Sequence, residues 1–200
     1  MPAPPTIIPD TSRADWTVDE LAQLPDDGNR YEVLDGALLV TPAPSFGHQR
    51  ASRELVRLLL PYLDGTGLEL FYAPAAVRSG PRTEVEPDVL VLPTLARTSD
   101  RCVAGLDQLV LAVEITSPST ARVDRYRKRA LYQRHGIAEY WVVDPASRFV
   151  ERWKPADSEP EVLAETLTWR PLVDRAPLVV DLGRYFDAVH GGNAPGASTP

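Results

Sequence analysis

Two apolar segments of the sequence each carry one acidic residue where a buried strand is expected. In "EVEPDVLVLP", Asp88 follows Pro87 directly and precedes four apolar residues, and in "LVLAVEITSPS", Glu114 stands between Val113 and Ile115. An ionised carboxylate inside an apolar strand is costly unless a cation or hydrogen bonds compensate it. Taken singly, each acid reads as a strand-end residue that is exposed or paired with an arginine. Taken together, two acids on neighbouring strands can converge to bind a hard divalent cation such as magnesium.

A basic segment supplies the second group that phosphodiester cleavage needs, a cation that orients the attacking water or offsets charge on the phosphate. Lys128 lies fourteen positions after Glu114 (128 − 114), on the helix expected to follow the Glu114 strand. On spacing it is either a lysine that points back over the sheet edge or a solvated lysine on a basic helix face. Arg122, Arg125 and Arg129 lie close to it in the sequence and are either phosphate contacts or ordinary surface charge.

The elements around these residues indicate a strand, a helix and a strand that cross over in parallel. "QLVLAVEITS" and "EYWVVDP" have the apolar character of buried strands, and "RVDRYRKRALYQRHG" between them predicts a helix that ends at Gly136. Units of this length normally form right-handed parallel crossovers. "EYWVVDPASRFVERW" predicts a hairpin through residues 145–147. Two further apolar segments, "LELFYAPAAVRS" and "PDVLVLP", complete a predicted mixed sheet.

The N-terminal half predicts a short helix, a hairpin and a longer helix. Thr17 and Glu20 have the spacing of a capping box in "TVDELAQL", and "YEVLDGALLVTP" contains the Asp-Gly pair of a tight hairpin. The segment 45–63 is an amphipathic helix that is expected to stop near Pro61. Near the C-terminus, "PLVVDLGRYFDAV" predicts a strand and a closing helix. The apolar residues expected on the buried side of the longer helix are Leu55, Leu58, Leu59 and Tyr62.

The bulk composition indicates one domain of ordinary size. The chain has 200 residues, of which 44% are hydrophobic, and we expect a domain over 15–189 between flexible tails at 1–14 and 190–200. The single cysteine, Cys102, excludes an internal disulfide and a cysteine-rich zinc site. The sequence has no apolar run of the ~20 residues that span a bilayer and no signal-peptide pattern, so we expect a cytoplasmic protein without membrane contact. The net charge of −7 argues mildly against nucleic acid as a partner.

The order of these residues resembles a known nuclease pattern. Pro87-Asp88, then Glu114, then a lysine is similar to the PD-(D/E)XK nuclease superfamily. The wider text from "WTVDELAQL" through "VEITSPSTARVDRYRKRALYQRHGIAEYWVVDP" resembles the Uma-two family of restriction endonucleases, a bacterial branch of that superfamily. The resemblance spans Trp16 to Pro145 and extends towards Asp187. It implies an α/β, restriction-endonuclease-like fold with a central mixed β-sheet flanked by helices and an N-terminal hairpin extension.

The resemblance also implies roles for individual residues. Asp88 and Glu114 match the two metal-binding acids, and Glu32 in "RYEVLDG" matches an early glutamate that can complete the metal site. Lys128 matches a catalytic lysine that these proteins place on the following helix. Where the superfamily motif has lysine, two positions after Glu114, this chain has Thr116. Either the lysine is displaced to position 128 or catalysis is weakened.

His48 in "SFGHQR" matches a position where the family often has histidine, and it is a second-rank catalytic residue. Without the resemblance, a histidine near a helix N-terminus is read as a capping or surface residue.

Two functions of different classes follow from these observations. The first is a magnesium-dependent endonuclease that acts on DNA, with manganese as an alternative to magnesium. In this function Arg122, Arg125 and Arg129 contact the DNA backbone, and the resemblance implies a homodimer. The second is a catalytically weak or inactive nuclease-fold protein that serves as a binding or scaffolding module, which the acidic net charge and Thr116 favour. Hydrolysis of another phosphate ester at the same site is a third reading.

Overall fold

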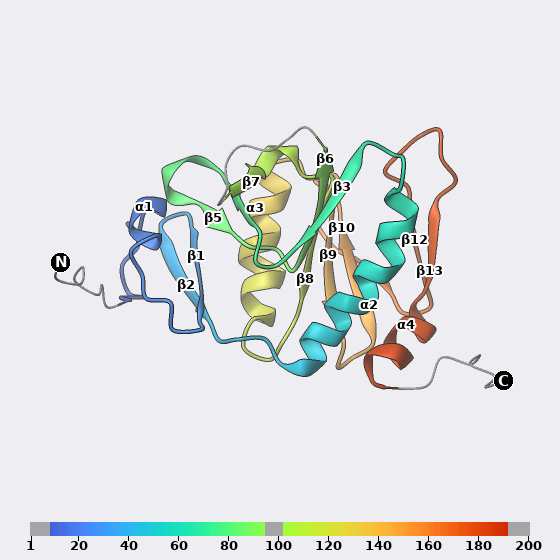
Figure 1. The fold of residues 1–200 in the computed structure, drawn as a ribbon, viewed down its shortest axis with the longest axis horizontal. Helices are drawn as coiled ribbons and strands as arrows, with labels where there is room; N and C mark the ends of the chain where they lie inside the picture. The colour runs from blue at the N-terminus through green and yellow to red at the C-terminus, as the bar shows by residue number, and fades with distance from the viewer. Residues whose placement is uncertain (1–8, 95–101, 192–200) are drawn as a thin grey trace.

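The computed structural model describes residues 9–94 and 102–191, so the expected tails lie mostly outside the described residues. The described chain contains a five-stranded sheet, a six-stranded sheet and a two-stranded ribbon (Figure 1). The helices are α1 Val18–Leu21, α2 Phe46–Leu63, the π-helical segment η3 Val123–Lys128, α3 Arg129–Arg134 and α4 Leu182–Val189, with short 3-10 turns at Gly80–Arg82 and Leu106–Gln108. In the described residues, no helix has the length and apolar character needed to cross a membrane.

The six-stranded sheet is the larger frame of the molecule. Its order is β11-β10-β9-β8-β6-β3, and β8 and β9 are parallel while their other neighbours pair antiparallel. The parallel pair confirms the predicted crossover, and the antiparallel β9 and β10 confirm the predicted hairpin. Its strands are β3 Leu68–Tyr72, β6 Val89–Pro93, β8 Leu111–Ile115, β9 Glu139–Asp144, β10 Phe149–Trp153 and β11 Glu161–Leu163.

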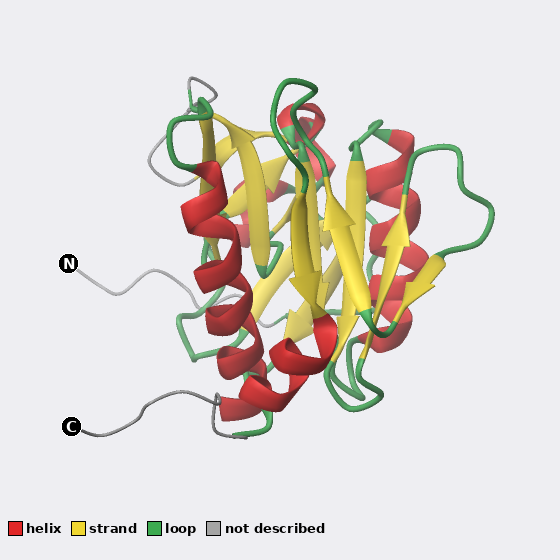
Figure 2. Cartoon of the chain, turned by 90° about the vertical axis from the view of Figure 1, so that its right-hand side faces the viewer, coloured by secondary structure: helices red, strands yellow, loops and turns green. Residues whose placement is uncertain are grey.

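Both faces of this sheet are covered, because its strands are apolar on both sides. Successive side chains of a strand point to opposite faces, so Val89 and Val91 join a core with α2 and α4 while Leu90 and Leu92 join a core with α3. Figure 2 shows the sheet between these two helical layers. Glu114 alternates with Val113 and Ile115 of the α2 face and therefore points to the α3 face.

The five-stranded sheet, in the order β2-β1-β5-β4-β7, carries the N-terminal hairpin. Asp35 and Gly36 form its turn and both have positive φ, at 53° and 85°, as the Asp-Gly pair predicts. Leu34 from this hairpin joins the α3 core, so the two sheets share one apolar layer. The strands are β1 Arg30–Leu34, β2 Ala37–Thr41, β4 Ala76–Arg78, β5 Glu84–Val85 and β7 Cys102–Gly105.

Replacing Gly36 with alanine is expected to lower the free energy of unfolding by about 2–3 kcal/mol, because a Cβ would add positive-φ strain and lie 2.6 Å from the carbonyl oxygen of Ala14. Gly28 is the matched control, since it has the same φ of 85° and its Cβ would have no neighbour within 4 Å. Gly28→Ala should cost only about 1 kcal/mol in the same urea titration. Equal losses for both variants would show that the close approach to Ala14 does not matter.

The helix predicted over 45–63 is observed as Phe46–Leu63, with Pro61 in its last turn. Two other predictions for the elements differ from the structure. Leu58 is partly exposed rather than core. The segment 68–79, expected as one strand, divides into β3 and β4 of different sheets. The ribbon of β12 Thr166–Trp169 and β13 Leu178–Asp181 contains the predicted C-terminal strand, and α4 is the predicted closing helix.

Candidate active site

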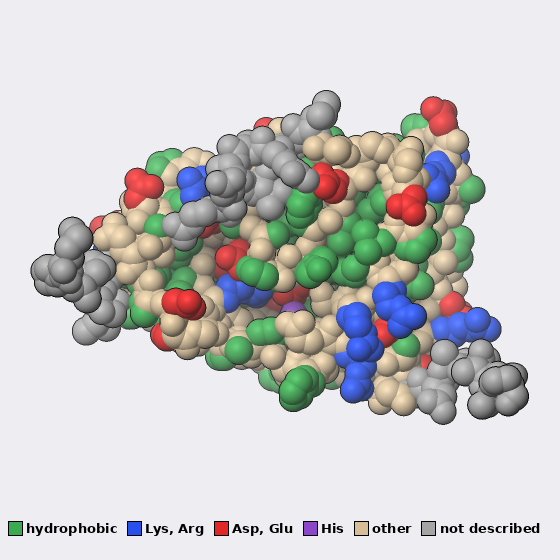
Figure 3. Space-filling view, in the orientation of Figure 1, with side chains coloured by type: hydrophobic (Ala, Val, Ile, Leu, Met, Phe, Trp, Pro, Cys, Tyr) green, Lys and Arg blue, Asp and Glu red, His purple; other side chains and the backbone are tan. Residues whose placement is uncertain are grey.

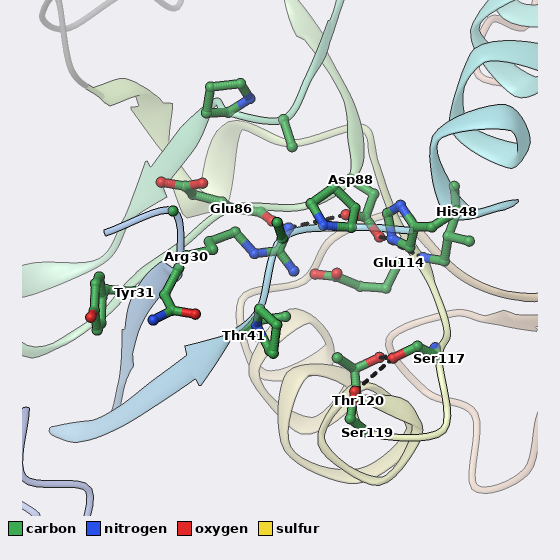
Figure 4. Close-up of a pocket in the computed structure, with 18 of the residues that line it drawn as sticks. Arg30, Tyr31, Thr41, His48, Glu86, Asp88, Glu114, Ser117, Ser119 and Thr120 are labelled. Carbon is green, nitrogen blue, oxygen red and sulfur yellow. Dashed lines mark hydrogen bonds and ion pairs between the residues drawn. The ribbon is translucent and has the colours of Figure 1, made fainter. Parts of the chain in front are cut away.

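A cleft of about 800 Å³ opens where the N-terminal hairpin, the start of α2 and the ends of β6 and β8 meet. Figure 3 shows this hollow, with basic, acidic and histidine side chains inside it. In the close-up of Figure 4, Arg30, His48 and Glu114 lie around Asp88 on the cleft floor. The residues that the sequence placed on separate segments therefore come together at one end of the large sheet.

Asp88 and Glu114 face each other because of strand register. β6 and β8 pair with Val89 opposite Val113 and Leu90 opposite Ala112, and the same register continued by one residue sets Asp88 opposite Glu114. Both side chains are almost fully buried and both line the cleft. The predicted convergence of the two acids is confirmed, and their role as metal ligands stays a prediction.

Asp88 is held as a carboxylate by three donors. The backbone N–H of Ile115 and Nε2 of His48 donate to Oδ2 at 2.7 and 3.0 Å, and Nη1 of Arg30 donates to Oδ1 at 3.0 Å. Burial by itself would raise the pKa of Asp88, but the hydrogen bond and charge of His48, then the charge of Arg30, outweigh burial and lower it. Both oxygens of this side chain are therefore already engaged by the protein.

Glu114 shares its Oε1 atom with two donors from the following helix. Nζ of Lys128 lies 2.9 Å away and the hydroxyl of Tyr132 lies 3.1 Å away. Lys128 also pairs with Oε1 of Glu32 at 2.8 Å, and the backbone N–H of Glu86 donates to the same oxygen at 2.7 Å. The lysine is 1% exposed, so the reading of a solvated surface lysine is wrong and the inward-pointing reading is confirmed.

Burial and the ion pair shift the pKa values of both Glu114 and Lys128. Burial raises the pKa of Glu114 well above its usual range, and the charge of Lys128 only partly opposes this shift. Burial disfavours the charged form of Lys128, but the carboxylates of Glu114 and Glu32 outweigh it, so its pKa is raised and it stays protonated. Lys128 thus holds Glu114 from the interior of the protein, since Glu114 lines the cleft and Lys128 is not among the described residues that do so.

The helix that carries Lys128 has a wider turn than the sequence predicts. Val123–Lys128 is π-helical, a geometry with i to i+5 hydrogen bonds that is found frequently at functional sites. It buries Asp124 together with Lys128. Burial raises the pKa of Asp124 to about 6. The charge of Lys128 lowers this pKa, whereas the charges of Asp88 and Glu32 raise it. Asp124 lines the cleft, whereas the ion pairs of Lys128 within the described chain go to Glu32 and Glu114.

Arg30 is the site residue that sequence reasoning missed. It lines the cleft, its side chain is partly exposed, and it links Asp88 to Glu32, whose Oε2 lies 3.7 Å from its Nε. Its place two residues before Glu32 in the same strand was the available signal, because residues two apart in a strand share a face. Arg30, not Lys128, is therefore the fixed cation that a ligand in the cleft would meet.

His48 is the third residue of α2, and its imidazole turns to Asp88, while Ser45 caps the helix by accepting a hydrogen bond from the backbone N–H of His48. Within the described chain, its buried Nδ1 has no hydrogen-bond partner. The alternative reading of His48 as a capping side chain is therefore wrong. Its predicted catalytic role remains open to experiment.

The three arginines predicted to contact DNA lie in different settings. Arg125 is ion-paired with Asp144 at 2.9 Å and with Glu151 at 2.6 Å. Arg129 lies over the ring of Trp153 at 4.7 Å, and Arg122 is exposed beside the cleft residues at 119–120. Structural pairing thus accounts for Arg125, and stacking accounts for Arg129. Arg122 keeps the exposure that a phosphate contact needs.

Thr116, which stands at the position of the motif lysine, hydrogen-bonds to the backbone of the neighbouring strand. Its N–H donates to the carbonyl oxygen of Val143 at 2.8 Å, and its hydroxyl donates to the same oxygen at 3.3 Å. These bonds continue the pairing of β8 with β9 past the last residue of the strand.

Carboxyl groups outnumber basic groups in the site. Four carboxyl groups stand against Arg30, Lys128 and the imidazole of His48, and burial, together with the neighbouring carboxylates, raises the pKa of Glu114 and Asp124. Among the described residues, no three His, Cys, Asp or Glu side chains are grouped as a ready-made metal site. Magnesium needs only one or two carboxylates with water and phosphate, so the donors fit such an ion. The four carboxyl groups are those of Glu32, Asp88, Glu114 and Asp124.

Comparisons with known proteins show the family and the fold of the chain. The model of the Uma2 family, described as "Putative restriction endonuclease", matches residues 18–176. The crystal structure of a "putative nuclease belonging to DUF820 from Anabaena variabilis ATCC 29413" is similar, with a TM-score of 0.72 and 20% sequence identity, over 87% of this chain and 99% of that chain. At this identity the likeness shows the fold. A comparison with curated proteins finds no match.

Proposed function

The chain belongs to the Uma2 family, and from this premise we propose that it is a metal-dependent endonuclease that hydrolyses phosphodiester bonds of DNA. The observation that carries the proposal is the pair of buried acids, Asp88 and Glu114, which face each other on the floor of one cleft. Several carboxyl groups in one buried site are destabilising unless a cation compensates them, and a divalent ion would supply such compensation.

Asp88 and Glu114 would hold the ion, and magnesium is the first candidate, with manganese the second. When bound, a divalent ion of this kind supplies positive charge at the scissile phosphate and lowers the pKa of a bound water. Glu32 is not among the described residues that line the cleft, and its Oε1 atom is engaged by Lys128 and by the N–H of Glu86. We therefore assign Glu32 to the support of Lys128 rather than to the ion.

The other site residues position these acids or meet the substrate. His48 and the N–H of Ile115 fix Asp88, and Lys128 and Tyr132 fix Glu114. Arg30 lines the cleft and is the group that would donate to a phosphate oxygen and offset the charge that develops there. Arg122 would add a backbone contact outside the cleft.

One observation favours the second candidate function, a binding or scaffolding module. Both oxygens of Asp88 already accept hydrogen bonds from the protein, so an ion must compete with Arg30 or His48 for this carboxylate. An inactive protein would keep these bonds under all conditions.

The deciding experiment is incubation of the wild-type protein with supercoiled and linear DNA in magnesium, in manganese and in EDTA, with calorimetric titration of each metal in parallel. We expect nicks and linear products only with metal, together with saturable metal binding. Intact DNA and no heat of binding up to millimolar metal would reject the nuclease and leave the scaffolding module.

Arg30→Gln is expected to reduce the rate of metal-dependent cleavage about 100-fold, because it removes the fixed cation of the cleft. Loss of a competitor for Asp88 should leave metal affinity equal or higher in calorimetry. Arg134→Gln is the control, since Arg134 is an exposed arginine paired with Asp35 away from the cleft, and it should cleave at the wild-type rate. A wild-type rate in Arg30→Gln would remove this residue from the reaction.

A further inference from the structure

The lining of the cleft has the wrong charge to hold nucleic acid by itself. Six of the described residues that line it carry carboxylates, against the single fixed cation of Arg30. A polyanion needs positive charge along its path. If the proposed function holds, the residues that retain the strand must therefore lie outside the cleft. The six acids are Asp26, Glu84, Glu86, Asp88, Glu114 and Asp124.

Helix α2 carries positive charge from the cleft outward. Its first turns supply lining residues, including His48 and Ser52. Further along, the side chains of Arg53 and Arg57 are 63% and 72% exposed, and they share the one acid Glu54. Figure 3 shows basic side chains gathered over this helix on the same face as the hollow. The helix therefore presents a net positive row that leads away from the acids.

Two exposed aromatic side chains lie at the cleft end of this path. Tyr72 lines the cleft and is 59% exposed. Phe46, the first residue of α2, is 93% exposed and follows Ser45, which lines the cleft. Exposed aromatic rings beside a basic track are the combination that single-stranded nucleic acid requires, because unpaired bases stack on the rings while arginines contact the backbone.

The size of the cleft points in the same direction. A volume of about 800 Å³ lies in the range that encloses one small-molecule ligand. The acids on its floor are almost fully buried, so a phosphodiester must enter the cleft to reach them. A single flexible strand can do this more readily than a duplex, whose second strand must also be accommodated.

We propose that the exposed side of helix α2, formed by Phe46, Arg53 and Arg57, is a track for single-stranded nucleic acid that feeds one strand into the cleft. This inference rests on the proposed function and names its substrate as a single strand or a frayed end. Arg53 and Arg57 contact successive phosphates, and Phe46 stacks on a base at the mouth.

The test is fluorescence anisotropy with a labelled oligonucleotide, as a single strand and as a duplex of the same sequence, in EDTA and at several salt concentrations. The wild type should prefer the single strand. Arg53→Gln/Arg57→Gln should weaken this binding about tenfold and make the slope of log affinity against log salt shallower by about 1.4, since each contact contributes about 0.7. Phe46→Ser should weaken binding about tenfold with an unchanged slope.

The control is Arg134→Gln/Arg170→Gln, which removes two exposed arginines outside helix α2 and should bind like the wild type. Equal affinity of the wild type for duplex and single strand, or an unchanged salt slope in Arg53→Gln/Arg57→Gln, would overturn the track. Absence of binding to either oligonucleotide would also overturn it.

Cleavage of the same oligonucleotides separates this inference from the proposed function. If the wild type and Arg53→Gln/Arg57→Gln cut DNA with metal at equal rates, the nuclease is supported and the track is rejected. A wild type that cuts nothing, yet binds a single strand through these arginines, rejects the nuclease and keeps the track.

Discussion

Lys128→Met is expected to lower the free energy of unfolding by ~3–5 kcal/mol, the cost of removing one partner from a buried charge cluster. The substitution leaves Glu32 and Glu114 without their shared cation, 2.8 and 2.9 Å from Nζ in the wild type. Urea unfolding can be followed by tryptophan fluorescence, because Trp16, Trp141 and Trp169 are buried. Without the lysine, whose charge opposes the effect of burial, the pKa of Glu114 in the folded state would rise further. The loss should therefore grow as pH rises above the wild-type pKa of Glu114, which itself lies well above the usual range.

Lys154 provides the matched control, because it is an exposed lysine and Lys154→Met should change stability by less than about 0.5 kcal/mol. The triple variant Glu32→Gln/Lys128→Met/Glu114→Gln removes both acids with the lysine and should recover part of the loss. A loss below ~1 kcal/mol in Lys128→Met would show that solvent reaches the cluster. It would also contradict the supporting role of this lysine.

Asp88→Asn and Glu114→Gln are each expected to reduce metal-dependent DNA cleavage by about three orders of magnitude, which corresponds to ~4 kcal/mol of transition-state stabilisation. Each substitution replaces one carboxyl group of the pair that lines the cleft with an amide. Glu114→Gln should lower the free energy of unfolding less than Lys128→Met does, because Glu32 still pairs with Lys128 at 2.8 Å. Cleavage rates and urea unfolding on the same preparations would separate lost chemistry from lost folding.

Asp26→Asn is the control for these two variants, since Asp26 lines the cleft but is exposed. It should cleave within about twofold of the wild type. A similar loss in Asp26→Asn would mean that cleft charge in general, rather than the facing pair, governs the rate. Full cleavage by Asp88→Asn would remove this aspartate from the reaction.

The sequence predicted those features that depend on a residue and its immediate neighbours in the chain. Asp88 and Glu114 could be identified because ionised acids rarely stand in apolar strands, and the hairpin turn followed from Asp35-Gly36. Lys128 was found from its helix, although its spacing alone left its direction open. The family, the fold and the parallel crossover are confirmed.

The rest depends on contacts between distant segments. Arg30 meets Asp88 across 58 positions, a distance in sequence that no local pattern encodes. The burial of Asp124 follows from the π-helical turn, which helical periodicity does not anticipate. The division of 68–79 between two sheets depends on which neighbouring strands are available for pairing.

The position of Lys128 on a helix rather than on the Glu114 strand also affects how sequence patterns detect such sites. A lysine two residues after a glutamate shares its side of a strand, which is why a search pattern of the form Glu-x-Lys works for many sites. In this chain the helix delivers Nζ to 2.9 Å from Glu114 while Thr116 ties β8 to β9. Such a pattern would classify the site as lacking its cation. A search based on spatial distance would find it.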